Sequence, residues 1–176
     1  TNLNDFEGDA SFSHTNLTNG KKVLALDTLK IITERVDKDR YLNLFSDLVE
    51  INADGNFTYG DLIEDLPRLF GEYMMVIENK KSVVEDYYKN AKPYSTPDYR
   101  VNFNLLLKKA NPLLALFNQE TIISDNSRLG GTFAKNEQKA SFNVIGLCSK
   151  IQLGGIKFYN SRLNYNSSKS LYHPFV

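Results

Sequence analysis

The feature that most constrains this chain is the spacing of its apolar side chains, which recur every three or four residues through much of its first two-thirds. This spacing places side chains on one face of a helix. It predicts helix over residues 22–50, either as one bent helix or as two separated at Asp37-Lys38-Asp39. The side chains of these stripes are Leu26, Leu29, Ile32, Val36, Tyr41, Leu44, Phe45, Leu48 and Val49.

A longer apolar stripe runs from Leu62 to Tyr88. Thr58, followed three residues later by Asp61, is typical of a capping box and predicts where this helix begins. Pro67 lies within the stripe and lacks an N–H, so we expect the helix to kink or restart there. A loop is predicted over residues 51–58, just before the capping box.

Other signals mark the flanking segments. Residues 1–20 are polar and rich in Asn and Gly, which predicts an irregular arm with a short strand at Ala10–Ser13. Val101 and Leu105 are spaced as in a further helix. A proline suits the first position of a helix and Asn is a good N-cap, so Asn111-Pro112 predicts a short helix over residues 112–117.

The last third has β character. Residues 142–147 are apolar and predict a strand. The alternating runs 151–153 and 156–159 flank Gly154-Gly155, a pattern typical of a β-hairpin. In that hairpin Leu153 faces Ile156 and Ile151 faces Phe158. Residues 171–176 are apolar enough to dock on the fold or to add an edge strand.

Together these patterns predict an α+β fold, with four or five helices packed on a small antiparallel sheet near the C-terminus. We expect one domain over residues 1–176, because its length suits one domain and no linker or repeat divides it. Within it, residues 1–20 form the arm, 21–120 are mainly helical and 121–176 are β-rich. A content of 41% apolar and 24% charged residues is that of a globular chain rather than a disordered one.

Charge is unevenly distributed although the net charge is zero. Residues 1–100 carry 12 Lys and Arg against 18 Asp and Glu, whereas residues 101–176 carry 9 against 3. Either the two halves attract each other within one fold, or the basic tail faces an acidic partner. The chain has no dense Lys and Arg run, which disfavours nucleic acid as that partner.

One motif has metal-ligating character. Counted from Glu50, oxygen-bearing residues stand at positions 1, 3, 5, 7, 9 and 12 of a twelve-residue stretch, with Gly55 at position 6; they are Glu50, Asn52, Asp54, Asn56, Thr58 and Asp61. This stretch resembles the calcium loop of EF-hand and dockerin modules, and the resemblance implies Ca²⁺ held between two helices. Position 1 is Glu where Asp is usual, and position 12 is Asp where EF-hands have Glu. The alternative is an ordinary turn that uses Asp54-Gly55.

A second motif is an apolar run from Tyr73 that ends in Glu78-Asn79-Lys80. As the end of a strand, it resembles part of a metal-dependent nuclease site in which Glu binds the metal and Lys orients the attacking water. Asp61 or Asp65 would supply the upstream carboxylate. As part of the helical stripe, Glu78 would instead be a solvated helix residue.

The remaining candidates are isolated residues. The two histidines, His14 and His173, stand at opposite ends of the chain, and a zinc site needs more ligands. Cys148 is the single cysteine, which rules out an internal disulfide and favours a reducing, intracellular compartment. No apolar run approaches the length of a membrane span. A cluster of tyrosines could stack on bases or sugars, or cover an edge of the core: Tyr87, Tyr88, Tyr94 and Tyr99.

No convergent acid, base and nucleophile is visible in the sequence, so an enzyme is disfavoured. The sequence favours a non-enzymatic interaction or structural subunit, with protein partners or copies of itself. A calcium-binding module and a metal-dependent nuclease are the alternatives.

Overall fold

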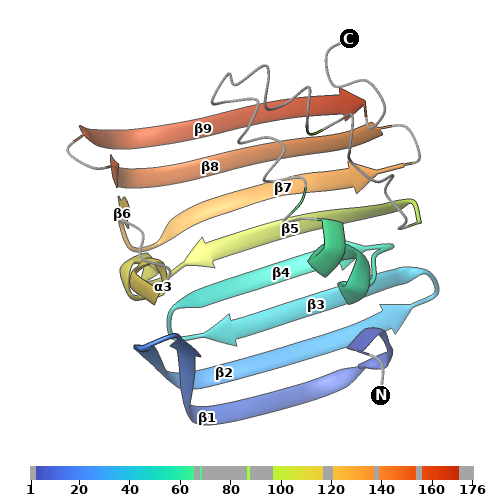
Figure 1. Cartoon of the computed structure of the whole chain (residues 1–176), viewed down its shortest axis with the longest axis horizontal. Helices are drawn as coiled ribbons and strands as arrows, with labels where there is room; N and C mark the ends of the chain where they lie inside the picture. Colours follow the sequence, from blue (N-terminus) through green and yellow to red (C-terminus); the bar gives the residue numbers. More distant parts are fainter. Residues whose placement is uncertain are drawn as a thin grey trace.

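The computed structural model describes residues 3–65, 68, 87, 97–116, 121–136, 139–153 and 156–170, and most of them form one antiparallel sheet (Figure 1). The nine strands are β1 (Gly8–Asn19), β2 (Lys22–Val36), β3 (Asp39–Ser46), β4 (Val49–Gly55), β5 (Tyr99–Leu107), β6 (Thr121–Ile123), β7 (Ser127–Lys135), β8 (Lys139–Leu153) and β9 (Ile156–Ser170). A 3₁₀ turn, η1 (Leu3–Asp5), precedes them, residues 59–65 are helical, and α3 (Ala110–Leu116) follows β5.

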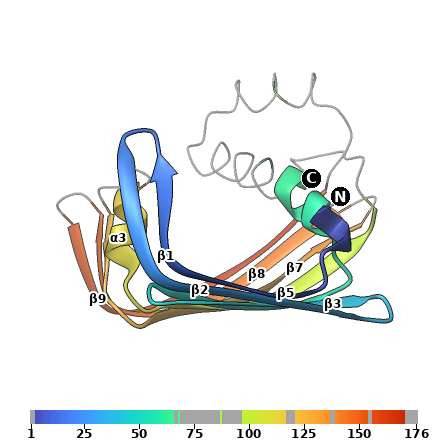
Figure 2. The ribbon, with the colours of Figure 1, turned by 90° about the horizontal axis from the view of Figure 1, so that it is seen from below.

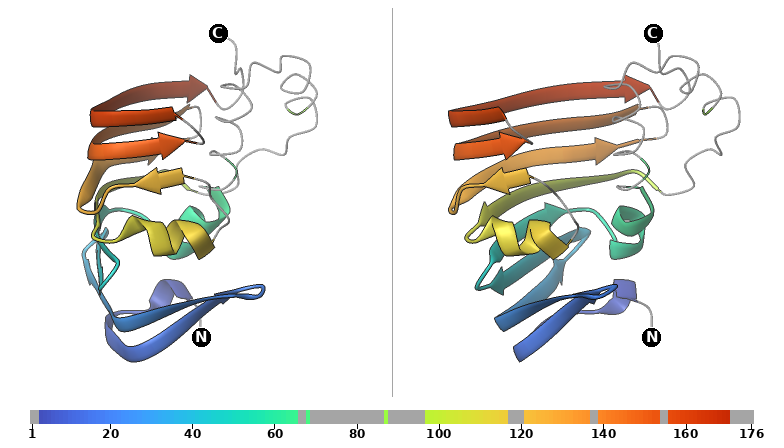
Figure 3. Two further views of the ribbon diagram at one scale, coloured as in Figure 1. Left: turned by 90° about the vertical axis from the view of Figure 1, so that its left-hand side faces the viewer. Right: turned by 60° about the vertical axis from the view of Figure 1, so that its left-hand side comes forward.

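The strands are ordered β1-β2-β3-β4-β5-β7-β8-β9, and each pairs antiparallel with its neighbour. The short β6 pairs with the far end of β8, beyond the part that pairs with β7. β1 and β9 are therefore the two edges of the sheet, at opposite ends of the row (Figure 3). Because eight strands alternate in direction, β1 and β9 run in opposite directions.

The sheet is curved, and the helical residues 59–65, α3 and the raised β1–β2 hairpin lie on its hollow side (Figure 2). We call this side the inner face and the opposite side the outer face. Paired residues share a face, so the register can be followed across all eight strands. One inner-face row is apolar throughout: Ala10, Ile31, Leu44, Ile51, Leu105, Leu129, Gly146 and Leu163.

The outer face is mainly polar. The adjacent outer row reads Asp9, Ile32, Asn43, Asn52, Asn104, Gly130, Ile145 and Asn164. Apolar burial is the dominant favourable term in folding. This difference between the faces therefore explains why the core and the helical segments are on the inner side.

The main core lies at the end of the inner face that residues 59–65 cover. Its buried members are Ala53, Phe57, Tyr99, Val101, Phe133 and Ala140. Phe133 is 2% exposed and its ring lies 5.6 Å from that of Tyr99 and 6.2 Å from that of Phe142. Burying one such ring stabilises the fold by about 2–3 kcal/mol. Tyr59 and Leu62 of the helical segment pack on the same cluster.

Buried polar contacts attach this helical segment to the sheet. Asp65 lies 3.5 Å from the Nζ of Lys135, both side chains are 2% exposed, and the Tyr99 hydroxyl donates to Asp65 Oδ2 at 3.1 Å. The fully buried Arg40 donates to the Asn4 carbonyl at 2.6 Å and lies 4.6 Å from the ring centre of Tyr59. Buried charges are tolerated when they are paired, as Asp65 and Lys135 are, or hydrogen-bonded, as Arg40 is. These contacts hold the segment on the sheet.

The expected α+β fold with four or five helices is wrong, because the described residues form mainly antiparallel sheet. Residues 1–20 contain β1 rather than an irregular arm, although the strand expected at Ala10–Ser13 lies within β1. Residues 21–120, expected to be mainly helical, contain β2, β3, β4 and β5. The loop expected at 51–58 is largely strand β4, and the helix expected from Val101 is strand β5.

The helical spacing in β2 has a structural cause. Leu24 and Leu26 are buried and belong to one cluster, and Leu29, three residues further on, packs against the same cluster. Between them the ladder with β1 is interrupted: His14, with φ of 52°, and Asp27 opposite it are not partners in the register, which is otherwise the same on both sides. A residue with positive φ departs from extended strand geometry and redirects the side chains around it. The inward set therefore changes from even to odd numbers, which imitates an i, i+3 stripe.

Several local predictions are confirmed. Thr58 and Asp61 form the capping box: Thr58 N donates to Asp61 Oδ2 at 3.3 Å, and Asp61 N donates to Thr58 Oγ1 at 3.2 Å. The strand expected at 142–147 lies within β8. The hairpin register is as predicted, with Leu153 opposite Ile156 and Ile151 opposite Phe158. The short helix expected at 112–117 is α3, which begins two residues earlier.

Other predictions fall mainly on residues outside the described ranges: the helix from Pro67 to Tyr88, the Gly154-Gly155 turn and the segment 171–176. No helix among the described residues is long and apolar enough to cross a membrane.

Candidate functional site

The inner face continues beyond the main core into an apolar pocket at the α3 end of the sheet. The pocket has a volume of about 300 Å³. Its apolar lining comes from β5, β6, β7, β8 and β9, and consists mainly of Leu107, Ile123, Leu129, Ile151, Phe158 and Leu163. We call these six residues the apolar pocket. They meet because neighbouring strands place residues of the same face side by side.

The apolar pocket reaches the edge strand β9, which supplies Phe158 and Leu163. Leu163 is 48% exposed and Phe158 is 46% exposed, and Ile156 nearby is 64% exposed. Scattered apolar side chains are normal on a surface, but a contiguous group beside a cavity marks a binding surface. β9 is also an edge strand with described neighbours on one side only, so its backbone is available for further pairing.

A small polar cluster lies at one side of the pocket. Ser127 donates to Cys148 Sγ at 3.0 Å, Cys148 donates to the Lys150 carbonyl at 3.0 Å, and Ser124 Oγ lies 3.3 Å from the same sulfur. Burial raises the pKa of the Cys148 thiol, but hydrogen bonds with the Ser124 and Ser127 side chains and with the backbone of Lys150 and Ser124 together outweigh it, so the pKa is lowered overall. A catalytic thiol also needs a base, and the contacts of this sulfur are hydroxyls and carbonyls. The cluster is therefore best explained as a set of hydrogen bonds that joins neighbouring strands.

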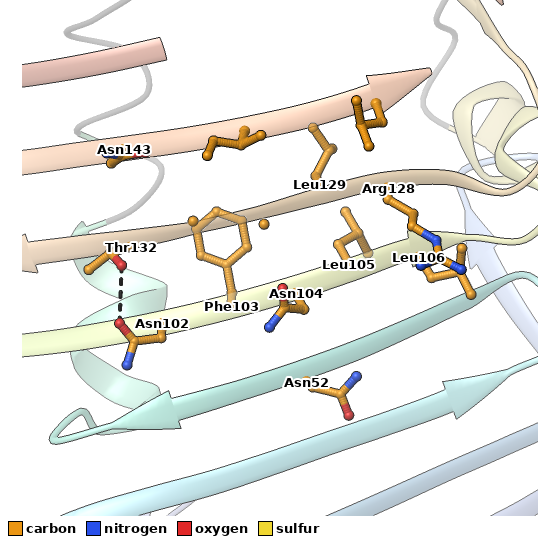
Figure 4. Close-up of a pocket in the computed structure, with 14 residues that line it drawn as sticks. Asn52, Asn102, Phe103, Asn104, Leu105, Leu106, Arg128, Leu129, Thr132 and Asn143 are labelled. Atoms are coloured by element: carbon orange, nitrogen blue, oxygen red, sulfur yellow. Dashed lines mark hydrogen bonds between the residues drawn. The ribbon is translucent and has the colours of Figure 1, made fainter. Parts of the chain in front are cut away.

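The outer face has a shallow groove of about 770 Å³ over β5, β7 and β8 (Figure 4). Gly130 has no side chain to fill the groove, and an added Cβ there would lie 2.8 Å from Asn104 Oδ1. Thr132 Oγ1 donates to Asn102 Oδ1 at 3.1 Å, and Asn102 Nδ2 donates to Asp54 at 2.8 Å. These polar groups satisfy one another across neighbouring strands, so the groove is a cross-strand network that stabilises the sheet.

The six residues of the calcium-loop motif are spread along the structure. Glu50, Asn52 and Asp54 alternate along the outer face of β4, so consecutive members stand about 7 Å apart. Glu50 lies 3.3 Å from the Nζ of Lys108, and Asn56 Oδ1 accepts from the Arg100 N–H at 2.7 Å.

Thr58 and Asp61, the last two residues of the motif, are engaged with each other in the capping box. The segment before the motif is strand β3 rather than the helix that the resemblance implies. Calcium binding stays a prediction, but this arrangement does not gather the six oxygens around one point. Among the described residues, no group of three or more His, Cys, Asp or Glu is placed to hold a metal ion.

The nuclease motif, with Glu78 and Lys80, lies outside the described residues, as does His173. Asp65, one of its proposed upstream carboxylates, is buried beside Lys135 and so is not open to a substrate. His14 lies in β1, at the edge of the sheet furthest from the apolar pocket.

Sequence reasoning found part of the pocket and missed the rest. The hairpin prediction placed Ile151 and Phe158 on one face. Leu107, Leu129 and Leu163 were missed, because the strands that carry them were assigned to helix or left unassigned. The alternation of Phe103, Leu105 and Leu107 is the period of two that could have revealed β5.

The fold and the site define an open, curved, antiparallel β-sheet with one apolar face and an apolar pocket beside an exposed edge strand. Comparison of the chain with protein-family models, with curated proteins and with solved structures found no match.

Proposed function

We propose that this protein is a non-enzymatic interaction module that binds an extended segment of a protein partner along the β9 edge. The observation that carries the proposal is the apolar pocket, which lies on the inner face directly beside a strand with one free side among the described strands. This arrangement provides the two components of strand addition. The exposed backbone of an edge strand gives affinity, and a pocket for alternate side chains gives specificity.

The partner segment is expected to be apolar on one side. Successive residues of a strand point to opposite faces, so every second side chain of an added strand would extend the apolar inner rows. Leu163 ends one of these rows and is half exposed. Covering the rest of a leucine side chain contributes about 1 kcal/mol, and several such contacts are needed to offset the cost of ordering the segment.

A non-catalytic role is supported by how the polar groups near the pocket are used. The Cys148 thiol and the Ser124 and Ser127 hydroxyls bond to one another and to backbone carbonyls. The buried Asp65–Lys135 pair holds a helical segment on the sheet. None of these groups needs a substrate to complete its bonding.

The test is a titration of the protein with anilinonaphthalene sulfonate, a dye whose fluorescence rises in apolar sites. Leu163→Asp introduces a charge at the pocket. The matched control is Ile145→Asp, because Ile145 is a similarly exposed aliphatic residue, at 45% against 48%, that lies on the outer face.

We expect Leu163→Asp to reduce dye affinity by about tenfold, the effect of losing about 1.4 kcal/mol. Ile145→Asp should bind as the unmodified protein does. Equal affinity in both variants, with unchanged far-UV circular dichroism, would show that the pocket is not a binding site.

A further inference from the structure

The charge asymmetry of the sequence has a defined place in the fold. Residues 1–65, which contain β1 to β4, carry 6 Lys and Arg against 13 Asp and Glu. Residues 101–176, which contain β6 to β9 and most of β5, carry 9 against 3. The sheet order puts the acidic half at the β1 end and the basic half at the β9 end (Figure 1).

The same asymmetry is present at the two edges themselves. Residues 1–20, which contain β1, have three acidic residues and no Lys or Arg. β9 has three basic residues and no Asp or Glu. Seven strand spacings of about 4.8 Å separate the edges, several times the screening length of about 8 Å in physiological salt. The two edges therefore cannot neutralise each other within one chain.

Both edges also expose apolar side chains on the inner face. Phe12 on β1 is 46% exposed and Leu163 on β9 is 48% exposed. Inside the sheet, residues of these rows are covered by the next strand. At the edges that strand is absent among the described residues, so these side chains are exposed because the sheet ends there.

We propose that the partner segment at β9 is strand β1 of a second copy of this chain, so that copies add head to tail. This inference rests on the proposed function, because it names the partner of the same edge. The directions match: β1 and β9 run in opposite directions, so a second copy placed by simple translation pairs antiparallel and continues the alternation of the sheet. The charges match as well, since a basic edge meets an acidic one.

The rows of paired residues show which side chains of β9 would face which side chains of β1 in a second copy. The apolar inner row that begins at Ala10 ends at Leu163, and the next outer row begins at Ser11 and ends at Arg162. If the rows continue from copy to copy, Leu163 meets Ala10, with Phe12 diagonally beside it. Arg162 then lies diagonally beside Asp9 on the outer face. Because the contact joins two different edges, it does not close on itself and builds an open series rather than a dimer.

The test is sedimentation velocity of the whole chain over a range of concentrations at low and high salt, with two charge-reversal variants. Lys157→Glu with Arg162→Glu makes the β9 edge acidic, and Asp5→Lys with Asp9→Lys makes the β1 edge basic. All four side chains are exposed. The matched control is Lys30→Glu with Arg128→Glu, which changes the net charge by the same amount on exposed residues of interior strands.

We expect the unmodified chain to form species larger than a dimer as concentration rises, and less so in high salt. The association constant of each edge variant alone should be at least about tenfold lower than that of the unmodified chain, because like charges then face each other. An equimolar mixture of the two edge variants should associate again, since each then offers the charge that the other needs. The interior control should behave as the unmodified chain does.

A monomer at all concentrations, or variants whose mixture does not recover association, would overturn the head-to-tail pairing. If only the β9 variant mattered, two β9 edges would be pairing, which also overturns it. The dye titration is independent of these outcomes. Suppose that Leu163→Asp loses dye affinity as expected but the chain is a monomer. The β9 edge would then still be the proposed binding edge, and its partner would be a different protein.

Discussion

Replacing Lys135 tests whether a buried charge pair holds the helical residues 59–65 on the sheet. Lys135→Met removes an ammonium that lies 3.5 Å from Asp65, where both side chains are 2% exposed. Breaking such a pair from one side costs about 3–5 kcal/mol, because the remaining charge stays buried. For a chain of this size, each kcal/mol lowers the melting temperature by about 2–4 °C. We therefore expect a fall of about 6–20 °C.

Removing both charges of the pair should cost less than removing one, because no partner is then left buried without its counter-charge. Asp65→Leu combined with Lys135→Met removes both charges of this pair, and such replacements are often neutral. We expect urea unfolding to give the double variant a higher free energy of unfolding than either single variant. The Tyr99 hydroxyl, which donates to Asp65 at 3.1 Å, loses that acceptor and limits the recovery by about 1–2 kcal/mol. Additive single effects, or singles below about 1 kcal/mol, would refute the argument, because close coupled charges are not additive.

Two further predictions concern stability. Gly55→Ala places a Cβ against the Arg100 carbonyl oxygen, whereas Gly8→Ala meets nothing within 4 Å, and both glycines have similar positive φ. In urea unfolding Gly55→Ala should therefore cost about 1–3 kcal/mol beyond the cost of Gly8→Ala, and equal costs would contradict the close approach. Burial, with the charge and hydrogen bond of Asp65, raises the pKa of Tyr99 far above its usual value. Its protonated hydroxyl thus stabilises the fold below about pH 10, and this contribution is lost as the pH rises further. The stability difference between the unmodified chain and Tyr99→Phe should shrink above about pH 10, and a difference that is constant with pH would contradict the assignment.

The sequence predicted local structure best where side chain and backbone contacts are close in the chain. The capping box of Thr58 and Asp61 is such a case, because its two hydrogen bonds span three residues. The hairpin of 151–153 with 156–158 is another, because only two residues separate the paired strands in the sequence. In both cases the interactions that decide the structure are visible in a short window of sequence.

The helical assignments failed where distant strands decide the structure. Leu26 and Leu29 in β2 have helical spacing because the interruption of the ladder at His14, twelve to fifteen residues away, changes which residues point inward. The turn at Asp37, with φ of 56°, joins β2 to β3, although the sequence indicated only an interruption in a helical stripe. Strand pairing gains its stability from cross-strand neighbours, which a single window does not contain.

By itself, the sequence determined that the two halves of the chain carry opposite charge and that the last third forms β structure. It left open whether the opposite charges meet within one fold or between molecules. The tertiary structure decided where the charges lie, because the order of the strands places the acidic and basic halves at opposite edges of one sheet. The tertiary structure also forms the apolar pocket, because Leu107, Leu129 and Leu163 come together only when strands far apart in sequence pair in register.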